Sequence, residues 1–509
     1  MFSVYRAAFL GFPFTINLVE AQQPAPKPQL ELRVQHDYLA LHVNGKAPAG
    51  TTAVEYRFVD AGEISKDAPW KPLATSGQDL SFKLDIPLPT SRWSEVQVRA
   101  MKGTEVLVSR ESHWPEDKLK LLTPDRIQRL PDNQKREWEA YLSRSKLRSE
   151  SEYDFIAAEC RKAGLAASAP APASKAELEV DSDTPPEWFA GENAQKLASG
   201  IISYQTPTGG WSKAVDFTQQ PRIPDMHWTS NEGNPWHYCG TIDNRATTEP
   251  IKILAGVYSA TKREDALAAL KRGLDYLFEA QYPNGGWPQN YPLESGYHEA
   301  ITLNDNAMVH VLEILLAIAD KKPPFVFADD ALSAKAKASF ERGIACLAGM
   351  QLKLDGKLTV WCAQHDPIDF SPVQARTKEP PSLSGAESAE LVKFLMRKAP
   401  LSEQTKAMIE PAIAWFEQHR LTGLRKTKNS LGRTDYVVDS GSSEIYWARF
   451  YDLKTGKAIF PGAEDGINYA THSEMAAKNK VAYDFMTTKP RDLLAKEVDR
   501  WKKRFEKNR

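Results

Sequence analysis

Cysteine is scarce in this 509-residue chain, and its four cysteines, Cys160, Cys239, Cys346 and Cys362, are widely scattered. Four such residues are too few for a disulfide framework. They also lack the paired C-x-x-C spacing that is typical of zinc sites. We therefore predict that they are buried core residues.

The chain also lacks an excess of charge of either sign, because 65 Lys and Arg balance 66 Asp and Glu. A near-neutral chain carries no global field for nucleic acid or an anionic membrane. No stretch after the apolar run at residues 7–18 approaches the ~20 apolar residues of a membrane-spanning helix. We predict no nucleic-acid partner, no membrane partner and a monomer, so any charge-based function must come from local clusters.

The first 21 residues are typical of a secretory signal. Arg6 precedes an apolar run at residues 7–18, and a small-x-small exit follows at Val19-Glu20-Ala21. An ordinary buried N-terminal segment is the alternative. With a signal at residues 1–21, the mature protein would be secreted or periplasmic.

The segment before residue 187 is expected to form an accessory part of the molecule. Residues 28–112 alternate in the manner of short strands, which predicts a small all-β sandwich domain. Its role is that of a spacer or, alternatively, a sugar-binding module. Thr123-Pro124-Asp125 opens a helical connector within residues 113–165, since proline is tolerated at the first helical position. An Ala- and Pro-rich linker follows at residues 166–186.

From residue 187 to the end, the apolar pattern is helical and the sequence repeats. Gln205-x-x-x-Gly-Gly-Trp recurs at Gln281, and a weaker echo begins at Gln351. Asp243-Asn-Arg-Ala is echoed by Asp305-Asn-Ala. Motifs that recur along the chain in this way indicate stacked units, each made of an outer helix, a loop and an inner helix. We predict a mainly α fold in which helix pairs close into a toroid, with the loops around one mouth.

Asp243 and Asp305 are the first candidates for chemistry. Aspartate is a preferred helix N-cap, so capping is the simplest interpretation of either residue alone. Toroid closure would instead aim both at the same mouth. Together with the amide oxygens of Asn244, Asn304 and Asn306, they would form an all-oxygen set that suits Ca²⁺.

Three further stretches could carry function. Arg376 lies in an extended segment before a helix, whose start is marked by the capping-box pattern Ser384-x-x-Glu387. A surface salt bridge is the alternative for this arginine. His365-Asp366 could be an acid/base pair or scaffold hydrogen bonds. Arg449 stands among aromatic residues, as in a sugar platform with a carboxylate clamp or in a packed strand.

These residues lie in motifs that resemble the pectate lyases of polysaccharide lyase family 10. The similar stretches run from about residue 203 to 466, and they occur in the order expected for that family. They are Gly209-Gly-Trp, Thr241-Ile-Asp-Asn-Arg-Ala-Thr-Thr-Glu-Pro, Gln281-Tyr-Pro-Asn-Gly-Gly-Trp-Pro, Ile301-Thr-Leu-Asn-Asp-Asn-Ala-Met, Trp361-Cys-Ala-Gln-His-Asp, Ala375-Arg, Ser382-Leu-Ser-Gly-Ala-Glu-Ser and Arg449-Phe-Tyr-Asp.

The resemblance implies an (α/α)₃ toroid that cleaves polygalacturonate by anti β-elimination with the help of Ca²⁺. It implies that Asp243 and Asp305 hold calcium or the uronate carboxylate, and that Arg376 is the Brønsted base, so that Arg376 and Asp243 are the expected catalytic residues. Arg449 would bind a carboxylate. Substrate contacts would also come from Asn244, Lys213, Trp287 and Trp361. The implied partner is an acidic polysaccharide.

The chain departs from the family pattern at three places. Residues 462–466 read Gly-Ala-Glu-Asp-Gly instead of Gly-Arg-Asp-Gly, so an arginine that would meet a substrate carboxylate is absent. Ser212 replaces a proline, and Asn306 stands where a second aspartate is common. The lost arginine bears on substrate affinity and uronate preference.

Three other functions remain open on the sequence alone. The Gln-x-x-x-Gly-x-Trp repeat also occurs in terpenoid cyclases and prenyltransferases, but this chain has no Asp-x-Asp-Asp motif or zinc set. A non-catalytic carbohydrate-binding or scaffold protein derived from a lyase is consistent with the lost arginine. A lyase or hydrolase acting on another uronate, such as alginate, is the third.

Overall fold

The computed structural model describes residues 30–36, 40–60, 69–76, 80–87, 94–113, 121–165, 170–174, 178–180, 184–224, 226–230, 240–294, 296–481 and 483–507. The proposed signal and Cys239 lie outside these residues. Cys160, Cys346 and Cys362 are free and buried, as predicted. No helix in the described ranges is long and apolar enough to cross a membrane.

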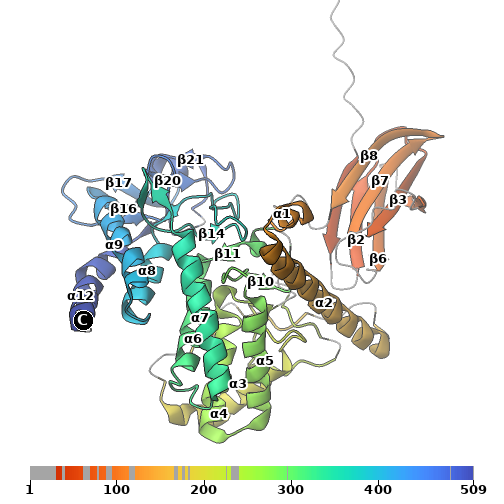
Figure 1. Ribbon diagram of the computed structural model, residues 1–509. Helices are drawn as coiled ribbons and strands as arrows, with labels where there is room; N and C mark the ends of the chain where they lie inside the picture. The colour runs from red at the N-terminus through yellow and green to blue at the C-terminus, as the bar shows by residue number, and fades with distance from the viewer. Residues whose placement is uncertain are drawn as a thin grey trace, which may run out of the picture.

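The N-terminal strands form two antiparallel four-stranded sheets, with the orders β1-β2-β6-β5 and β4-β3-β7-β8 (Figure 1). The alternation of apolar residues thus predicts strands correctly. Between the sheets, β1 and β8 lie in contact. The strands are β1 (Glu31–His36), β2 (Ala40–Lys46), β3 (Ala53–Asp60), β4 (Lys71–Leu73), β5 (Thr75–Ser76), β6 (Ser81–Pro87), β7 (Ser94–Lys102) and β8 (Glu105–His113).

Two helices connect the sheets to the rest of the chain. Helix α1 (Pro124–Gln128) is capped by the Thr123 hydroxyl, which accepts from the Arg126 backbone N–H, as the Thr-Pro-Asp pattern predicts. Pro131 separates it from the long helix α2 (Asp132–Ala163). Figure 1 shows α2 leaning along the side of the helical region.

The remainder is mainly helical, as predicted, and its helices follow one another in pairs. The helices are α3 (Glu192–Ser203), α4 (Thr248–Thr261), α5 (Glu264–Ala280), α6 (Ala307–Ala319), α7 (Asp330–Met350), α8 (Glu387–Arg397), α9 (Glu403–Gln418), α10 (His472–Lys478), α11 (Lys489–Asp492) and α12 (Val498–Lys507). Successive helices α4 and α5, α6 and α7, and α8 and α9 pack on each other. Helix α6 is buried along most of its length, since it is apolar on nearly every side.

The predicted repeat is visible as one glutamine hydrogen-bonding pattern that occurs three times. The amide of Gln205 donates to Gly209 O and to Ala269 O in α5. The amide of Gln281 donates to Gly285 O and to Ser339 O in α7. Each glutamine follows one outer helix and bonds the next, which we call a glutamine clasp.

The weaker echo at Gln351 is a genuine third member of this series. Its amide donates to Thr359 O and to Met408 O in α9. The clasps thus join α3, α5, α7 and α9 in order. In the first two loops, Gly209 and Gly285 have positive φ, and a Cβ there would collide with a carbonyl of the next outer helix. Only glycine fits such a position.

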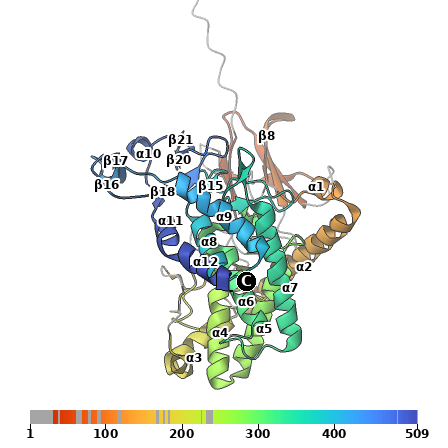
Figure 2. The ribbon, with the colours of Figure 1, turned by 60° about the vertical axis from the view of Figure 1, so that its left-hand side comes forward.

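Short strands carry the loops between the helices. They are β9 (Gly240–Thr241), β10 (Asn290–Tyr291), β11 (Ile301–Thr302), β12 (Lys353–Leu354), β13 (Lys357–Leu358), β14 (Gln364–His365), β15 (Leu383–Ser384), β16 (Leu424–Lys428), β17 (Thr434–Val438), β18 (Trp447–Ala448), β19 (Phe450–Tyr451), β20 (Ala458–Pro461), β21 (Asn468–Tyr469) and β22 (Met486–Thr487). As Figure 2 shows, the strands of residues 424–469 gather at one end of the helices. The sheet β15-β19-β20-β21 places residue 449 beside the start of α8.

The predicted linker is not a free tether throughout. Ala173 forms a β-bridge with Val215, and the backbone of Ser174 donates to Ala214 O. Lys213, a predicted site residue, directly precedes Ala214. The segment before α3 therefore pairs with the loop that carries Lys213.

Candidate active site

Two single-turn 3₁₀ segments bring the predicted acidic residues together. They are Asp243–Arg245 after β9 and Asn304–Asn306 after β11, and they contact each other. Each contains two consecutive residues with positive φ, which are Asn244 and Arg245 in the first turn and Asp305 and Asn306 in the second. The two motifs therefore lie next to each other, as the prediction of a shared mouth requires.

The backbone corrects the alignment of the two motifs. Residues with the same conformation match Asn244 to Asp305, and hence Asp243 to Asn304. The repeat spacing here is one residue shorter than the sequence pattern suggests. The two aspartates thus approach the mouth from neighbouring positions of equivalent turns, not from matching ones. Asparagine and aspartate tolerate the left-handed conformation that these turns require.

Neither aspartate serves as a helix cap. The turns and the helices α4 and α6 that follow them lack side-chain cap hydrogen bonds. The buried Asp243 carboxylate instead accepts from Lys213 Nζ at 2.7 Å. The Asp305 carboxylate accepts from Asn304 Nδ2 at 2.7 Å. The capping interpretation is therefore wrong for both residues.

The electrostatics of Asp305 reflect this crowding of acids. Partial desolvation at the pocket wall, where 46% of its side chain stays exposed, and then the negative charge of Asp243 raise the pKa of the Asp305 carboxyl to about 6, while Arg449 and Arg376 oppose the rise. The Arg449 guanidinium lies 4.0 Å from Asp305 Oδ1. A carboxylate held near a second acid is electrostatically suited to take up a cation.

Arg449 is held in a polar network beneath the mouth. Its Nη2 donates to the buried carboxylate of Glu387 and, at 3.2 Å, to Asn304 Oδ1. Its guanidinium also stacks on the Tyr483 ring, 4.1 Å from the centroid. Glu387 is the last residue of the predicted capping box, and its backbone N–H does bond Ser384 Oγ. The capping box is only partly realised, because the Glu387 carboxylate bonds Arg449 and the Ser384 hydroxyl.

Arg376 lies on a turn closed by Glu379. Both Nε and Nη2 of Arg376 donate to the Glu379 carboxylate, and its backbone N–H does so at 3.1 Å. These bonds raise the pKa of the Arg376 guanidinium above its usual value, despite opposing desolvation. In this arrangement, Arg376 is a firmly protonated cation. The Tyr483 hydroxyl donates to the same carboxylate at 2.7 Å and lies 3.4 Å from Arg376 Nη2.

A pocket of about 470 Å³ collects these groups, and Asp305, Arg376, Arg449 and Tyr483 all line it. A second pocket, of about 200 Å³, shares Asp305 and Arg449 and is also lined by Asn244. The two pockets flank one acid and one arginine, so an extended anionic chain could lie across both.

Two predicted substrate contacts are wrong. Trp287 and Trp361 are completely buried. Their indole N–H groups donate to Leu277 O and Leu347 O of the preceding helices. A sugar ring cannot stack on either side chain, because both fill the space between helices. Their spacing in the repeat reflects core packing.

His365 and Asp366 belong to the scaffold. His365 is fully buried between Phe370 O and the Cys362 backbone N–H, and this burial lowers the pKa of its imidazole to about 4. The Asp366 carboxylate bonds Arg126 of helix α1. Of the two sequence interpretations, the scaffold role is therefore confirmed.

Several residues of the site were not identified from the sequence. Glu379, Glu387 and Tyr483 bind the two arginines directly. The Tyr297 hydroxyl has a pKa raised to about 12, mainly by burial, in the fields of Arg376, Glu379 and Asp243. Glu387 had a sequence signal in its capping-box pattern and Glu379 in its spacing three residues after Arg376, whereas Tyr297 and Tyr483 had none.

The loop that lacks the family arginine is well ordered by its own contacts. Asp465 accepts from Tyr469 Oη, Asn479 Nδ2 and the Ile467 backbone N–H. At Gly466, a Cβ would lie 3.2 Å from Thr377, so the loop borders the turn of Arg376. The substitution thus lies next to the site and changes its charge.

Comparisons with known proteins bear on the family of this chain. Residues 205–494, more than half of the chain, match the model of the family described as pectic acid lyase. The structure resembles the family 10 polysaccharide lyase from Cellvibrio cellulosa, with 30% identity, a TM-score of 0.52, 62% of this chain covered and 97% of the other. It also resembles an alanine mutant of that enzyme solved in complex with trigalacturonic acid, with 30% identity, a TM-score of 0.52 and coverages of 61% and 95%. A search among curated proteins found no match.

The fold and site therefore define a polysaccharide lyase. Specifically, the chain belongs to the pectic acid lyase family.

Proposed function

We propose that this lyase cleaves polygalacturonate by anti β-elimination and produces 4,5-unsaturated oligogalacturonides. The observation that carries the proposal is that Asp305, Arg376 and Arg449 line one recess, while the turn of the buried Asp243 contacts that of Asp305. The similarity to a lyase solved with trigalacturonic acid supports an acidic polysaccharide as the substrate.

Ca²⁺ is the proposed cofactor, and Asp243 and Asp305 would hold it. The residues fit a hard cation, because two carboxylates lie close enough for one to raise the pKa of the other. Among the described residues, no group of three His, Cys, Asp or Glu forms a metal site. Calcium takes six to eight oxygens, so uronate and water oxygens would complete its shell. When bound, calcium would neutralise charge on the substrate carboxylate.

The side chains around the recess would act on the sugar acid next to the scissile bond. Loss of the C5 proton is difficult beside a carboxylate, so the positive charge of Arg449 would stabilise the enolate-like species that develops. The electron pair of the broken C5–H bond then forms the C4–C5 double bond, the bond from C4 to the glycosidic oxygen breaks, and that oxygen takes a proton from water. Lys213 is proposed to bind substrate beside Asp243, its partner at 2.7 Å.

Arg376 is proposed as the base that takes the C5 proton. This role requires a neutral guanidinium, whereas Glu379 holds it protonated in the structure. Substrate binding would therefore have to break the contact with Glu379 and bring Arg376 under the influence of other cations. We expect such an enzyme to work best at alkaline pH.

The finer architecture and the location of the protein belong to the same proposal. The helix pairs α4/α5, α6/α7 and α8/α9 would make up an (α/α)₃ toroid, with the acidic turns at its mouth. The β-rich N-terminal part would be an accessory sandwich domain. A polymeric uronate substrate would lie outside the cytoplasm, which agrees with the secretory signal expected at residues 1–21.

A direct assay tests the function. The protein is incubated with polygalacturonate and Ca²⁺ at alkaline pH, and the absorbance of the new C4–C5 double bond is followed. We expect the signal to disappear with a chelator and to fall about 10²- to 10⁴-fold in Arg376→Ala. Asp320→Asn, at an exposed surface acid, is the matched control and should leave the rate unchanged.

Other results would point to the competing functions. Activity on alginate but not on polygalacturonate would indicate a different uronate preference, to which the loop at residues 462–466 would contribute. Binding of a polyuronate without any new double bond would indicate a non-catalytic relative of the lyases.

A further inference from the structure

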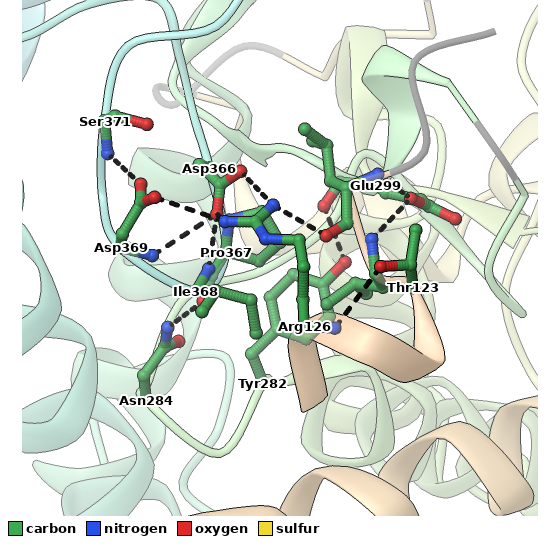
Figure 3. Close-up of polar contacts among 12 residues, drawn as sticks. Thr123, Arg126, Tyr282, Asn284, Glu299, Asp366, Pro367, Ile368, Asp369 and Ser371 are labelled. Carbon is green, nitrogen blue, oxygen red and sulfur yellow. Dashed lines mark hydrogen bonds and ion pairs between the residues drawn. The ribbon is translucent and has the colours of Figure 1, made fainter. Parts of the chain in front are cut away.

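A short segment ahead of the family-matched region reaches the loops of the active site. Residues 121–126 lie outside the matched residues 205–494. Figure 3 shows Arg126 pointing from helix α1 toward the acids Asp366 and Asp369, with Glu299 on the opposite side of the segment. The segment thus lies between two parts of the catalytic region that are far apart in the sequence.

Arg126 makes a bidentate ion pair with Asp366. Its Nη1 lies 2.6 Å from Asp366 Oδ2, and its Nη2 lies 2.9 Å from Oδ1 and 3.2 Å from Asp369 Oδ2. Only 5% of the Asp366 side chain is exposed, so the pair is shielded from water on the acid side. Paired Arg–carboxylate geometry of this kind fixes orientation as well as adding energy.

The loop that Arg126 holds leads into the turn of Arg376. Within it, Asp366 also accepts from the Ile368 backbone, and its own N–H donates to Ser371 O. The Val373 backbone then bonds Gln364 O, three residues before Arg376. A continuous set of short-range bonds therefore connects the ion pair to the segment that carries the proposed base.

The other side of the segment is fixed to the loop that carries Tyr297. The Glu299 carboxylate accepts from the backbone N–H groups of Leu121 at 2.9 Å and Leu122 at 3.3 Å. Leu121 is buried in a small apolar cluster with Ala300 and Val373. One leucine therefore packs against residues from both loops at once.

We infer that residues 121–126 are a positioning element of the active site, and that Arg126 acts through Asp366 to set the place of Arg376. The inference rests on the proposed function, because it assigns Arg376 the role of base. Neither Arg126 nor Leu121 is among the residues that line the two pockets. Misplacement of a reacting group by about 1 Å can reduce a rate about 10²-fold, so a distant anchor of this kind can control turnover.

The test compares Arg126→Ala with Arg148→Ala in the full chain. Arg148 is a matched control, because it also joins the helical connector to the core by a bidentate pair, with Glu279. We expect Arg126→Ala to lower kcat about 10- to 100-fold with little change in KM, while Arg148→Ala stays within about twofold of the wild type. Arg126→Lys, which keeps the charge but not the fork, should be intermediate. It also serves as the test if the alanine variant does not fold.

Amide hydrogen exchange of residues 366–376 provides a second readout that does not depend on lyase activity. Faster exchange in Arg126→Ala than in Arg148→Ala is expected. If the two variants have the same kcat and the same exchange, the segment is a structural brace only and the inference is overturned. If the wild type cleaves no polyuronate, the proposed function fails, whereas the exchange experiment still decides whether Arg126 orders the Arg376 turn.

Discussion

The charge state of single side chains at the site depends on the balance between two acids and several cations. Asp243 has a partner in Lys213, whereas Asp305 faces the pocket with Arg449 at 4.0 Å. The ordinary pKa of an aspartate is near 3.9, and that of Asp305 is raised to about 6. The Asp305 carboxyl is therefore expected to take up a proton in mildly acidic solution, which would change the charge of the site.

We predict that calcium affinity falls as the pH is lowered through about 6. Below this pH the Asp305 carboxyl is protonated, and a metal ion must then displace the proton. The loss should approach about tenfold per pH unit below the pKa. Isothermal titration from pH 5 to 8 measures it. Asp305→Asn should bind more weakly and lack this step, whereas an unchanged wild-type affinity between pH 5 and 7 would contradict the prediction.

The same raised pKa has a consequence for stability with the opposite sign. Because the folded state holds the proton more tightly than the unfolded chain, ionised Asp305 disfavours folding at neutral pH. This unfavourable contribution disappears as the pH falls from about 6 toward the ordinary aspartate pKa. Acid therefore weakens the cation site while relieving a local repulsion.

Residue-scale prediction from the sequence succeeded where a motif marks a turn and failed where partners come from elsewhere. Asp243 and Asp305 were placed at one mouth because each introduces an inner helix. Glu379 and Tyr483 were missed, because Tyr483 contacts Arg376 and Glu379 across more than a hundred residues of sequence. Trp287 was misassigned because an indole suits a core as well as a sugar.

At the scale of elements, the glutamine clasps explain why the repeat is detectable at all. Each clasp uses one buried amide to satisfy two carbonyls, one in its own loop and one in the next outer helix. A buried amide without acceptors is costly, so each glutamine is held between its loop carbonyl and its helix carbonyl. The one-residue error in aligning the acidic turns arose because Asp-Asn occurs in both at different backbone positions.

We predict that Gln281→Ala lowers the free energy of unfolding by about 2–4 kcal/mol, because it removes the buried bonds to Gly285 O and Ser339 O and leaves the buried Ser339 hydroxyl without its acceptor. Urea denaturation of the folded enzyme measures the change. Gln418→Ala, on the exposed surface at the end of α9, is the control and should stay within about 0.5 kcal/mol. Equal stabilities of the two variants would show that the clasp is not needed.

At the scale of the whole molecule, the order of the parts was predictable but their coupling was not. Strand alternation, a capped helix and a helical repeat indicated the β-rich part, the connector and the main helical region. Nothing in the sequence showed that Leu121 packs with Ala300 and Val373, or that Ala173 pairs with Val215. Such contacts depend on tertiary placement, which local patterns do not encode.

We predict that removal of residues 1–113 leaves turnover on soluble oligogalacturonides within about twofold, because among the described residues the two N-terminal sheets pair only within themselves and the site residues lie beyond residue 121. Removal of residues 1–131 should lower kcat by at least about tenfold, since it deletes Leu121 and Arg126. Steady-state kinetics of the two truncated enzymes check this. Equal losses would place an essential contribution in the sheets themselves.

The clasps also bear on how a chain of this kind could change its size in evolution. Each clasp joins one repeat to the next. A helix pair gained or lost between two repeats is therefore accommodated only if the outer helix that follows places a backbone carbonyl within reach of the glutamine. Duplication in whole units preserves that match, whereas a shift of a few residues within one outer helix breaks it. Variation in length is therefore expected in the loops that carry the pocket residues, where new sugar specificities can arise without disturbing the row of helices that the clasps join.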